Sequence, residues 1–145
     1  MRKILLILGV VFLMAVQVMA SNKVNVVDMD YILKKLDTKA IIIDVRSREV
    51  YNGKTPGRGI KGGHIPGAIN IPLDIFMNKD DLEKINLLRS KKIDLETEII
   101  TYCNTGRKSK VLANELVRLG YLNVNNYKGS MQEWGAISTN KVIVK

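Results

Sequence analysis

The sequence predicts an α/β fold in which a mostly parallel central sheet of about five strands carries helices on both faces. Residues 40–45 form a continuous, mainly β-branched run, which is typical of a strand buried on both faces of a parallel sheet. Segments with helical spacing alternate with further short apolar runs, as in open α/β sheets. The chain has 145 residues, of which 46% are hydrophobic, so we expect one domain with a substantial core.

The elements of the N-terminal half can be assigned in order. Residues 24–36 begin as a short apolar stretch and continue as a helix, with Asp28 as its cap and apolar residues four apart on one face. The strand at residues 40–45 comes next. Residues 52–63 are rich in Gly and Lys, which predicts a loop. A second, short strand is expected at residues 68–72.

The C-terminal half continues the alternation of helices and strands. It predicts a helix at 80–89, a strand at 98–102, a helix at 108–119, a strand at 123–127 and a short helical turn at 130–134. The longer of these helices has leucines four apart on one stripe, and Gly120 ends it. The strand before that helix leads directly into Cys103.

The first twenty residues have the pattern of a signal peptide. A short basic start is followed by an almost purely apolar run at residues 4–16, and Val18-Met19-Ala20 is typical of a cleavage site. We therefore predict a signal peptide at residues 1–20, an exported domain at residues 21–145 and no stable membrane insertion after cleavage. The alternative is a retained anchor helix, but the apolar run is short against the about 20 residues that a span needs.

The chain is basic, with a formal net charge of +9, and loss of Arg2 and Lys3 with the signal peptide would leave +7. A basic surface is one property of nucleic-acid-binding proteins. The lysines here are scattered rather than interleaved with aromatic residues, and an exported domain rarely meets nucleic acid. We expect no nucleic-acid partner. A positive field that attracts small anions, or simple solubility, fits the charge better.

Cys103 is the only cysteine, so it has no partner for an intramolecular disulfide. Exported domains usually pair their cysteines, and this one must be held by its core alone. Most free cysteines are small buried hydrophobes, so the surrounding residues decide the role of this one.

The residues after Cys103 favour a reactive thiolate. They are Asn104, Thr105, Gly106, Arg107, Lys108 and Ser109, and a helix follows them. The start of a helix presents free N–H groups and a positive dipole end, and Gly106 allows the loop to curl so that several N–H groups converge. Such a loop lowers the pKa of a thiol. It suits a nucleophile that attacks an anionic sulfur compound and then carries that sulfur as an anionic persulfide.

Four segments in this order resemble the rhodanese family over nearly the whole mature chain. They are Asp44-Val45-Arg46, the Gly-His-Ile-Pro-Gly segment within residues 63–72, the loop at residues 103–109, and residues 129–134 with Trp134. The Cys-Asn-x-Gly-Arg form, together with the signal peptide, is most similar to small periplasmic phage-shock-type rhodaneses.

The resemblance implies a single rhodanese-like domain that acts as a thiosulfate sulfurtransferase in the periplasm. Cys103 would carry sulfur from a small anionic donor to a thiol or cyanide, with the loop residues 104–109 binding the substrate. It implies no cofactor and no metal, and we expect a monomer. A single His and a single Cys also make a metal site improbable on the residues alone.

The sequence departs from the family pattern at several positions. Asn104 and Lys108 stand where many members have Arg, and lysine loses the bidentate hydrogen bonding of a guanidinium. Ser130 replaces the second Gly of the closing element. The segment at residues 53–62 is longer than in minimal members. Its Arg58 is expected to contact a substrate sulfonate, with a solvated loop as the alternative.

Three further residues are expected near the site in structural roles. His64 is the only histidine, so a Cys–His dyad is considered, but its place inside Gly-His-Ile-Pro-Gly favours stabilisation of a turn. Asp44 and Arg46 are expected to form an ion pair, with a catalytic contact as the alternative.

Two other functions are compatible with parts of this pattern. Dual-specificity phosphatases share the fold and the cysteine, but they need Arg six positions after it, where this chain has Ser109. A persulfide carrier or sulfur-binding module that hands sulfur to a partner protein without turnover would have the same sequence. We therefore predict a sulfurtransferase and keep the carrier as the alternative.

Overall fold

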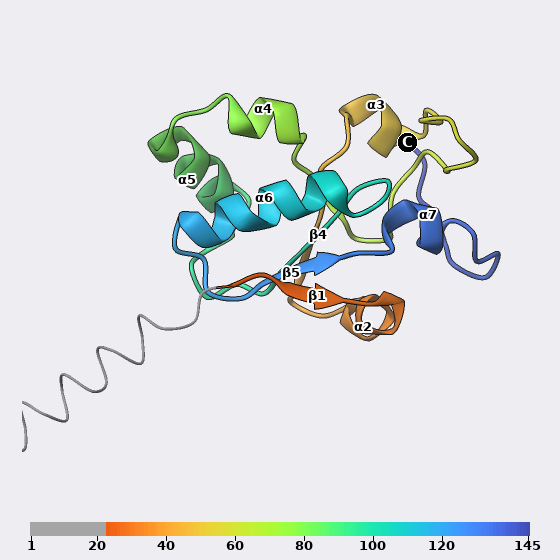
Figure 1. Ribbon diagram of the computed structural model, residues 1–145, viewed down its shortest axis with the longest axis horizontal. Helices are drawn as coiled ribbons and strands as arrows, with labels where there is room; N and C mark the ends of the chain where they lie inside the picture. The colour runs from red at the N-terminus through yellow and green to blue at the C-terminus, as the bar shows by residue number, and fades with distance from the viewer. Residues whose placement is uncertain (1–22) are drawn as a thin grey trace, which may run out of the picture.

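The computed structural model describes residues 23–145 as a five-stranded sheet flanked by helices (Figure 1). The strands are β1 (Asn25–Val27), β2 (Ile41–Asp44), β3 (Ile69–Asn70), β4 (Ile99–Tyr102) and β5 (Val124–Tyr127). They lie in the order β1-β5-β4-β2-β3, and every neighbouring pair is parallel. The predicted parallel α/β sheet is confirmed. The predicted signal peptide, residues 1–20, lies outside the described residues.

Six helices are found in the described part of the chain. They are α2 (Met29–Lys35), α3 (Arg48–Asn52), α4 (Leu73–Met77), α5 (Asp81–Ser90), α6 (Arg107–Arg118) and α7 (Ser130–Trp134). Neither α3 nor α4 was predicted, because helices of five residues are too short to show helical periodicity. From residue 23 to residue 145, none of the helices has the length and apolar character needed to cross a membrane.

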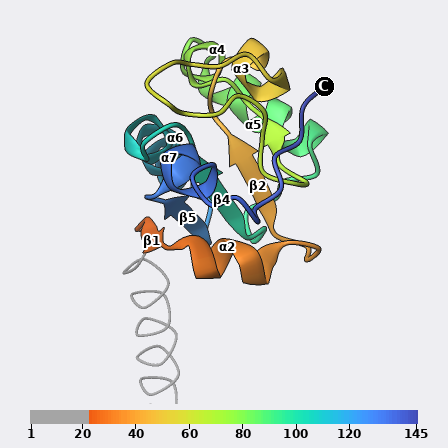
Figure 2. The ribbon, with the colours of Figure 1, turned by 90° about the vertical axis from the view of Figure 1, so that its right-hand side faces the viewer.

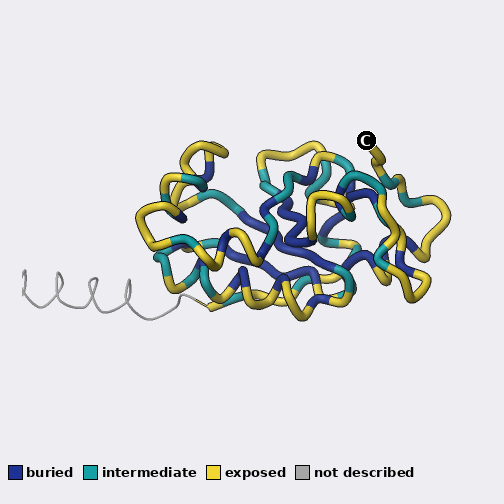
Figure 3. The backbone as a smooth tube through the Cα atoms, turned by 90° about the horizontal axis from the view of Figure 1, so that it is seen from above, coloured by how far each residue is buried: buried dark blue, intermediate teal, exposed yellow. Residues whose placement is uncertain are grey.

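The sheet is buried on both faces. On one face, Ile43, Ile99 and Cys103 belong to a core cluster that α4, α5 and α6 complete. On the other face, Ile42 and Ile100 pack in a second cluster with residues of α2 and α7. Figure 2 shows α2 and α4 on opposite sides of the sheet, and Figure 3 shows the buried strands at the centre within an exposed rim. This two-sided burial explains the continuous apolar runs in β2 and β4.

Side-chain caps begin three of the helices, α2, α3 and α5. Asp28 accepts the N–H of Tyr31 at 3.0 Å, so the predicted cap of α2 is confirmed. Asp80 and Glu83 form a reciprocal capping box at the start of α5, with bonds of 2.8 and 2.9 Å.

An ion-pair network joins α5 to α6. Lys84 of α5 is buried and donates to Glu115 of α6 at 2.8 Å. Arg118, one turn further along α6, contacts Glu115 at 2.7 Å and Asp81 at 2.6 Å. The network holds α6 against α5, and the N-terminal end of α6 forms part of the site described next.

Candidate active site

The site lies at the carboxyl ends of β2 and β4. From β2 the chain passes to β3 on one side, and from β4 it passes to β5 on the other, so these two adjacent strands form the switch point of the sheet. Loops diverge at such a point and leave a crevice, which is where open α/β proteins bind ligands. Cys103 is the first residue after β4.

A pocket of about 830 Å³ opens at this switch point. Its lining comes from three segments, residues 45–50 after β2, residues 72–75 at the start of α4, and residues 103–108 except Gly106. The positively charged residues of the lining are Arg46, Arg48, Arg107 and Lys108, and the negatively charged ones are Glu49 and Asp74. Apart from Asp74, the wall at the start of α4 is apolar. The excess of positive charge suits a small anion.

Cys103 lies at the base of the pocket and is only 2% exposed. Its Sγ accepts the backbone N–H of Gly106 at 3.1 Å. The backbone of Cys103 is held by α7. Its N–H donates to Ser130 Oγ at 3.1 Å, and its carbonyl accepts the N–H of Met131 at 3.0 Å. The sulfur is therefore fixed by the main chain and by the first turn of α7.

Gly106 makes the curl of the loop possible. It has a φ of +84°, and a Cβ on it would lie 2.4 Å from the carbonyl oxygen of Lys128. Asn126 donates to the Gly106 carbonyl at 3.1 Å and fixes the turn from β5. Only glycine fits this position without displacing the backbone of residue 128.

The pKa of the Cys103 thiol is lowered. Burial is the largest influence and acts to raise it, but hydrogen-bond donors outweigh burial. The groups that lower it are the N–H groups of Ser109, Thr105 and Gly106, together with the nearby hydroxyl of Ser109, whose Oγ has no hydrogen-bond partner among the described residues. The predicted anion cradle is present, and it favours the thiolate form of Cys103.

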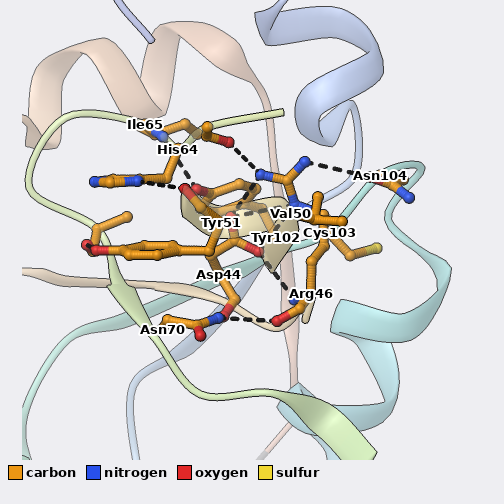
Figure 4. A network of polar contacts seen from close by, with 12 residues as sticks. Asp44, Arg46, Val50, Tyr51, His64, Ile65, Asn70, Tyr102, Cys103 and Asn104 are labelled. Carbon is orange, nitrogen blue, oxygen red and sulfur yellow. Dashed lines mark hydrogen bonds and ion pairs between the residues drawn. The ribbon is translucent and has the colours of Figure 1, made fainter. Parts of the chain in front are cut away.

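Asp44 and Arg46 form a buried ion pair beside the site, with 2.7 Å between Oδ2 and Nη2. The guanidinium also donates to the carbonyls of Lys61 and Gly63 and to Asn104 Oδ1, the last at 3.4 Å (Figure 4). One side chain thus ties the loop after α3 to the residue that follows Cys103. The ion pair is formed as expected.

His64 is buried on the other side of this network. Its Nδ1 is 2.8 Å from the carbonyl oxygen of Tyr51, and its ring stacks on the Tyr51 ring with 3.7 Å between centroids. Its backbone pairs with Ile143 through two bonds of 2.9 Å. Figure 4 shows the imidazole on the far side of the network from the Cys103 sulfur. No Cys–His dyad is formed, and His64 ties the C-terminal segment to α3.

Residues 28–137 match the rhodanese-like domain family, which is more than half of the chain. The chain belongs to this family. The match includes both the switch-point strands and the cysteine loop.

Relatives of this rhodanese domain are named for sulfur chemistry. A putative thiosulfate sulfurtransferase of Mycolicibacterium smegmatis is 36% identical over 74% of this chain and 43% of its own length. The sulfur carrier protein TtuD of Thermus thermophilus is 34% identical over 74% of this chain and 42% of its own length. The chain therefore spans about two fifths of the length of these relatives.

A solved structure gives the same fold. An EanB variant in complex with ergothioneine covalently linked to a cysteine persulfide superposes with a TM-score of 0.75 and 30% sequence identity. The superposition covers 84% of this chain and 28% of that one.

Arg58 does not reach the pocket of the rhodanese domain. It is exposed, with a φ of +57°, in the turn that the bridge between Gly57 and Ile60 closes, and it is not among the pocket residues. The expectation that it binds a substrate sulfonate is therefore not supported. The loop that carries it meets the site only through the Lys61 and Gly63 carbonyls.

Of the predicted loop residues, Asn104, Thr105, Arg107 and Lys108 line the pocket together with Cys103. Gly106 and Ser109 instead are buried and do not line the pocket. Sequence reasoning missed Arg48 and Asp74, which line the pocket from α3 and α4. A local signal was available for α3, because Ser47 follows β2 and accepts the N–H of Val50 as a helix cap.

The donor set of the site is poor in metal ligands. Across residues 23–145, no three side chains of His, Cys, Asp or Glu are grouped as a metal ion would require.

Proposed function

We propose that this rhodanese domain transfers sulfane sulfur from a small anionic donor, such as thiosulfate, to a thiol or cyanide through a persulfide on Cys103. The observation that carries the proposal is the position of the Cys103 sulfur. It accepts the Gly106 N–H in a loop that lowers its pKa, at the base of a pocket with excess positive charge.

In the first step, the Cys103 thiolate attacks the outer sulfur of the donor. A new S–S bond forms to Sγ, the S–S bond of thiosulfate breaks, and sulfite leaves with the electron pair of that bond. Arg48, Arg107 and Lys108 offset the negative charge of the donor as it approaches the thiolate. The N–H groups of the loop stabilise the charge on sulfur before and after the step.

In the second step, the acceptor attacks the outer sulfur of the persulfide. The electron pair of the Sγ–S bond returns to Sγ, which leaves as the thiolate. The resting enzyme is restored, and no external oxidant or reductant is consumed. Sγ is therefore the nucleophile in the first step and the leaving group in the second, and the loop stabilises its negative charge in both.

A persulfide carrier is the second candidate function. It is supported by the likeness to a protein named as a sulfur carrier and by the exposed Ile75, which is 59% accessible at the pocket wall and available to a protein partner. A phosphatase is not supported, because the position that needs Arg is the buried Ser109.

Export to the periplasm and a monomeric state are also part of the proposal. Export rests on the pattern of residues 1–20. Expression of the full chain in a bacterial host, followed by fractionation and N-terminal sequencing, should find the protein in the periplasm with Ser21 first. A product that keeps Met1 in the membrane fraction would favour the anchor. Sizing of the same product tests the monomer.

Thiocyanate formation from thiosulfate and cyanide tests the enzyme against the carrier. The wild type should turn over many times, and Cys103→Ser should be inactive. A single stoichiometric transfer by the wild type would favour the carrier. Equal inactivity of both proteins would reject the enzyme.

A further inference from the structure

Ser109 has an unusual hydroxyl group. Its side chain is fully buried, at 0% exposure, in the first turn of α6, three residues beyond the cap Gly106. Among the described residues, its Oγ is the only buried side-chain oxygen or nitrogen without a hydrogen-bond partner. Native proteins rarely bury a hydroxyl in this way, because the lost bond to water is not replaced. Such a group needs a functional reason.

The surroundings of Ser109 point to the sulfur of Cys103. The backbone of Ser109 is already engaged, since its carbonyl accepts the hydroxyl of Thr101 at 3.0 Å. Its side chain is fully buried and does not line the pocket, so a substrate in the pocket would not contact it. Ser109 stands in the same turn as Gly106, whose N–H donates to the Cys103 sulfur at 3.1 Å, and its hydroxyl acts to lower the pKa of the thiol.

We propose that Ser109 is a catalytic hydrogen-bond donor, whose hydroxyl is left free in the resting protein so that it can bond to the Cys103 sulfur when that atom is negatively charged. The inference rests on the proposed function, because sulfur transfer places charge on Sγ at the start of the first step and at the end of the second.

The difference between thiol and thiolate explains why the bond is absent at rest. A neutral thiol is a weak acceptor, whereas hydrogen bonds to charged acceptors are about twice as strong as neutral ones. A hydroxyl can rotate to donate without moving the backbone. The donor is thus in place before the charge develops, which is the arrangement that stabilises transition states most effectively.

Other groups around the sulfur limit the size of the effect. The charged residues that face Cys103 are Arg46, Arg48, Glu49, Asp74, Arg107 and Lys108, from the end of β2, α3, α4 and α6. The N–H groups of Thr105, Gly106 and Ser109 also act on it. Removing one hydroxyl should therefore weaken the thiolate without abolishing it.

The test is Ser109→Ala, with two measurements on the same protein. The rate of Cys103 alkylation by iodoacetamide against pH reports the thiolate, and urea unfolding reports stability. We expect the alkylation midpoint to rise, so that the rate below it falls about threefold to tenfold. Stability should be unchanged or higher, because the variant removes a hydroxyl that has no partner.

Ser130→Ala is the matched control. Ser130 is also a fully buried serine beside Cys103, but its hydroxyl is bonded, since it accepts the Cys103 N–H and donates to the Tyr127 carbonyl at 2.8 Å. Its loss should lower stability, which shows that the unfolding measurement detects a bonded hydroxyl.

Two results would overturn the inference. An unchanged alkylation midpoint in Ser109→Ala would show that the hydroxyl does not act on the sulfur. A loss of stability, whatever the midpoint, would show a structural role. Intact mass after incubation with thiosulfate separates this failure from that of the proposed function. If the wild type gains a sulfur atom and its midpoint matches that of the variant, only the role of Ser109 fails.

Discussion

The backbone N–H of Gly106 donates to the sulfur of Cys103 across 3.1 Å. The nucleophile is therefore stabilised by the main chain, while the cationic side chains of the pocket remain available to bind the anionic sulfur donor. The sequence departs from common family members in those side chains, with Asn104 and Lys108 in place of Arg, but it keeps the glycine on which the main-chain bond depends.

Gly106→Ala should destabilise the protein by about 2 kcal/mol or more, because a left-handed residue gains a Cβ and that Cβ meets the Lys128 carbonyl. The Cys103 alkylation midpoint should also rise, since the loop must open. Urea unfolding and alkylation measure the two effects. Gly67→Ala is the control, because Gly67 has a φ of +79° with nothing near its missing Cβ. This variant should lower the free energy of unfolding by about 1 kcal/mol and leave the alkylation midpoint unchanged.

The pocket cations should affect donor binding more than turnover. The double variant Arg107→Ala, Lys108→Ala should raise the KM for thiosulfate about threefold to tenfold with a smaller change in kcat. Steady-state thiocyanate formation measures both constants. Arg58→Ala is the control, because it removes a positive charge outside the pocket, and it should change neither KM nor kcat. If Arg58→Ala raised the KM for thiosulfate more than the double variant did, the loop that carries Arg58 would have to be part of the binding site.

The buried pair of Asp44 and Arg46 should be sensitive to loss of one partner. Arg46→Ala leaves a buried carboxylate without its cation and should lower the free energy of unfolding by about 3 to 5 kcal/mol. The double variant Asp44→Ala, Arg46→Ala should lose less free energy of unfolding than the two single variants lose together. Urea unfolding of the three variants completes the cycle. Additive losses would show that the pair is not coupled.

Glu115 should make stability depend on pH in the acid range. Its hydrogen bonds with Arg118 and Lys84 outweigh burial and lower its pKa to about 2. A carboxyl whose folded pKa is depressed contributes stability above its unfolded pKa and loses it as pH falls through the folded one. We expect about 2 kcal/mol at pH near 7, lost progressively between pH of about 4.5 and 2.

The comparison for this prediction is Glu115→Gln, with the exposed Glu96→Gln as control. Urea unfolding at neutral and acid pH should show a gap between wild type and Glu115→Gln that closes on acidification. A gap that stayed constant, or one equally large for Glu96→Gln, would contradict the assignment.

Much of the fold could be predicted because its signals are local. The apolar runs of β2 and β4 and the leucine stripe of α6 reflect burial that each segment shows by itself. The short helices α3 and α4 have no such period, since they are placed by packing at the end of the sheet. That Arg58 does not line the pocket could not be seen from the sequence either, because the course of a long loop depends on contacts that its own residues do not reveal.

The site was predictable to the same extent. Cys103 and its loop could be identified because the nucleophile, the glycine and the cations are adjacent in the chain. Arg48 joins them only through the pairing of β2 with β4. The free hydroxyl of Ser109 is a property of three-dimensional packing, so no pattern in the sequence indicates it.

The persulfide on Cys103 is the central claim, and intact mass spectrometry tests it most directly. Wild-type protein incubated with thiosulfate should gain about 32 Da, the mass of one sulfur atom, and should lose it when cyanide is added. Cys103→Ser should gain nothing under the same conditions. An unchanged mass for the wild type, or an equal gain in Cys103→Ser, would contradict the proposed sulfur transfer.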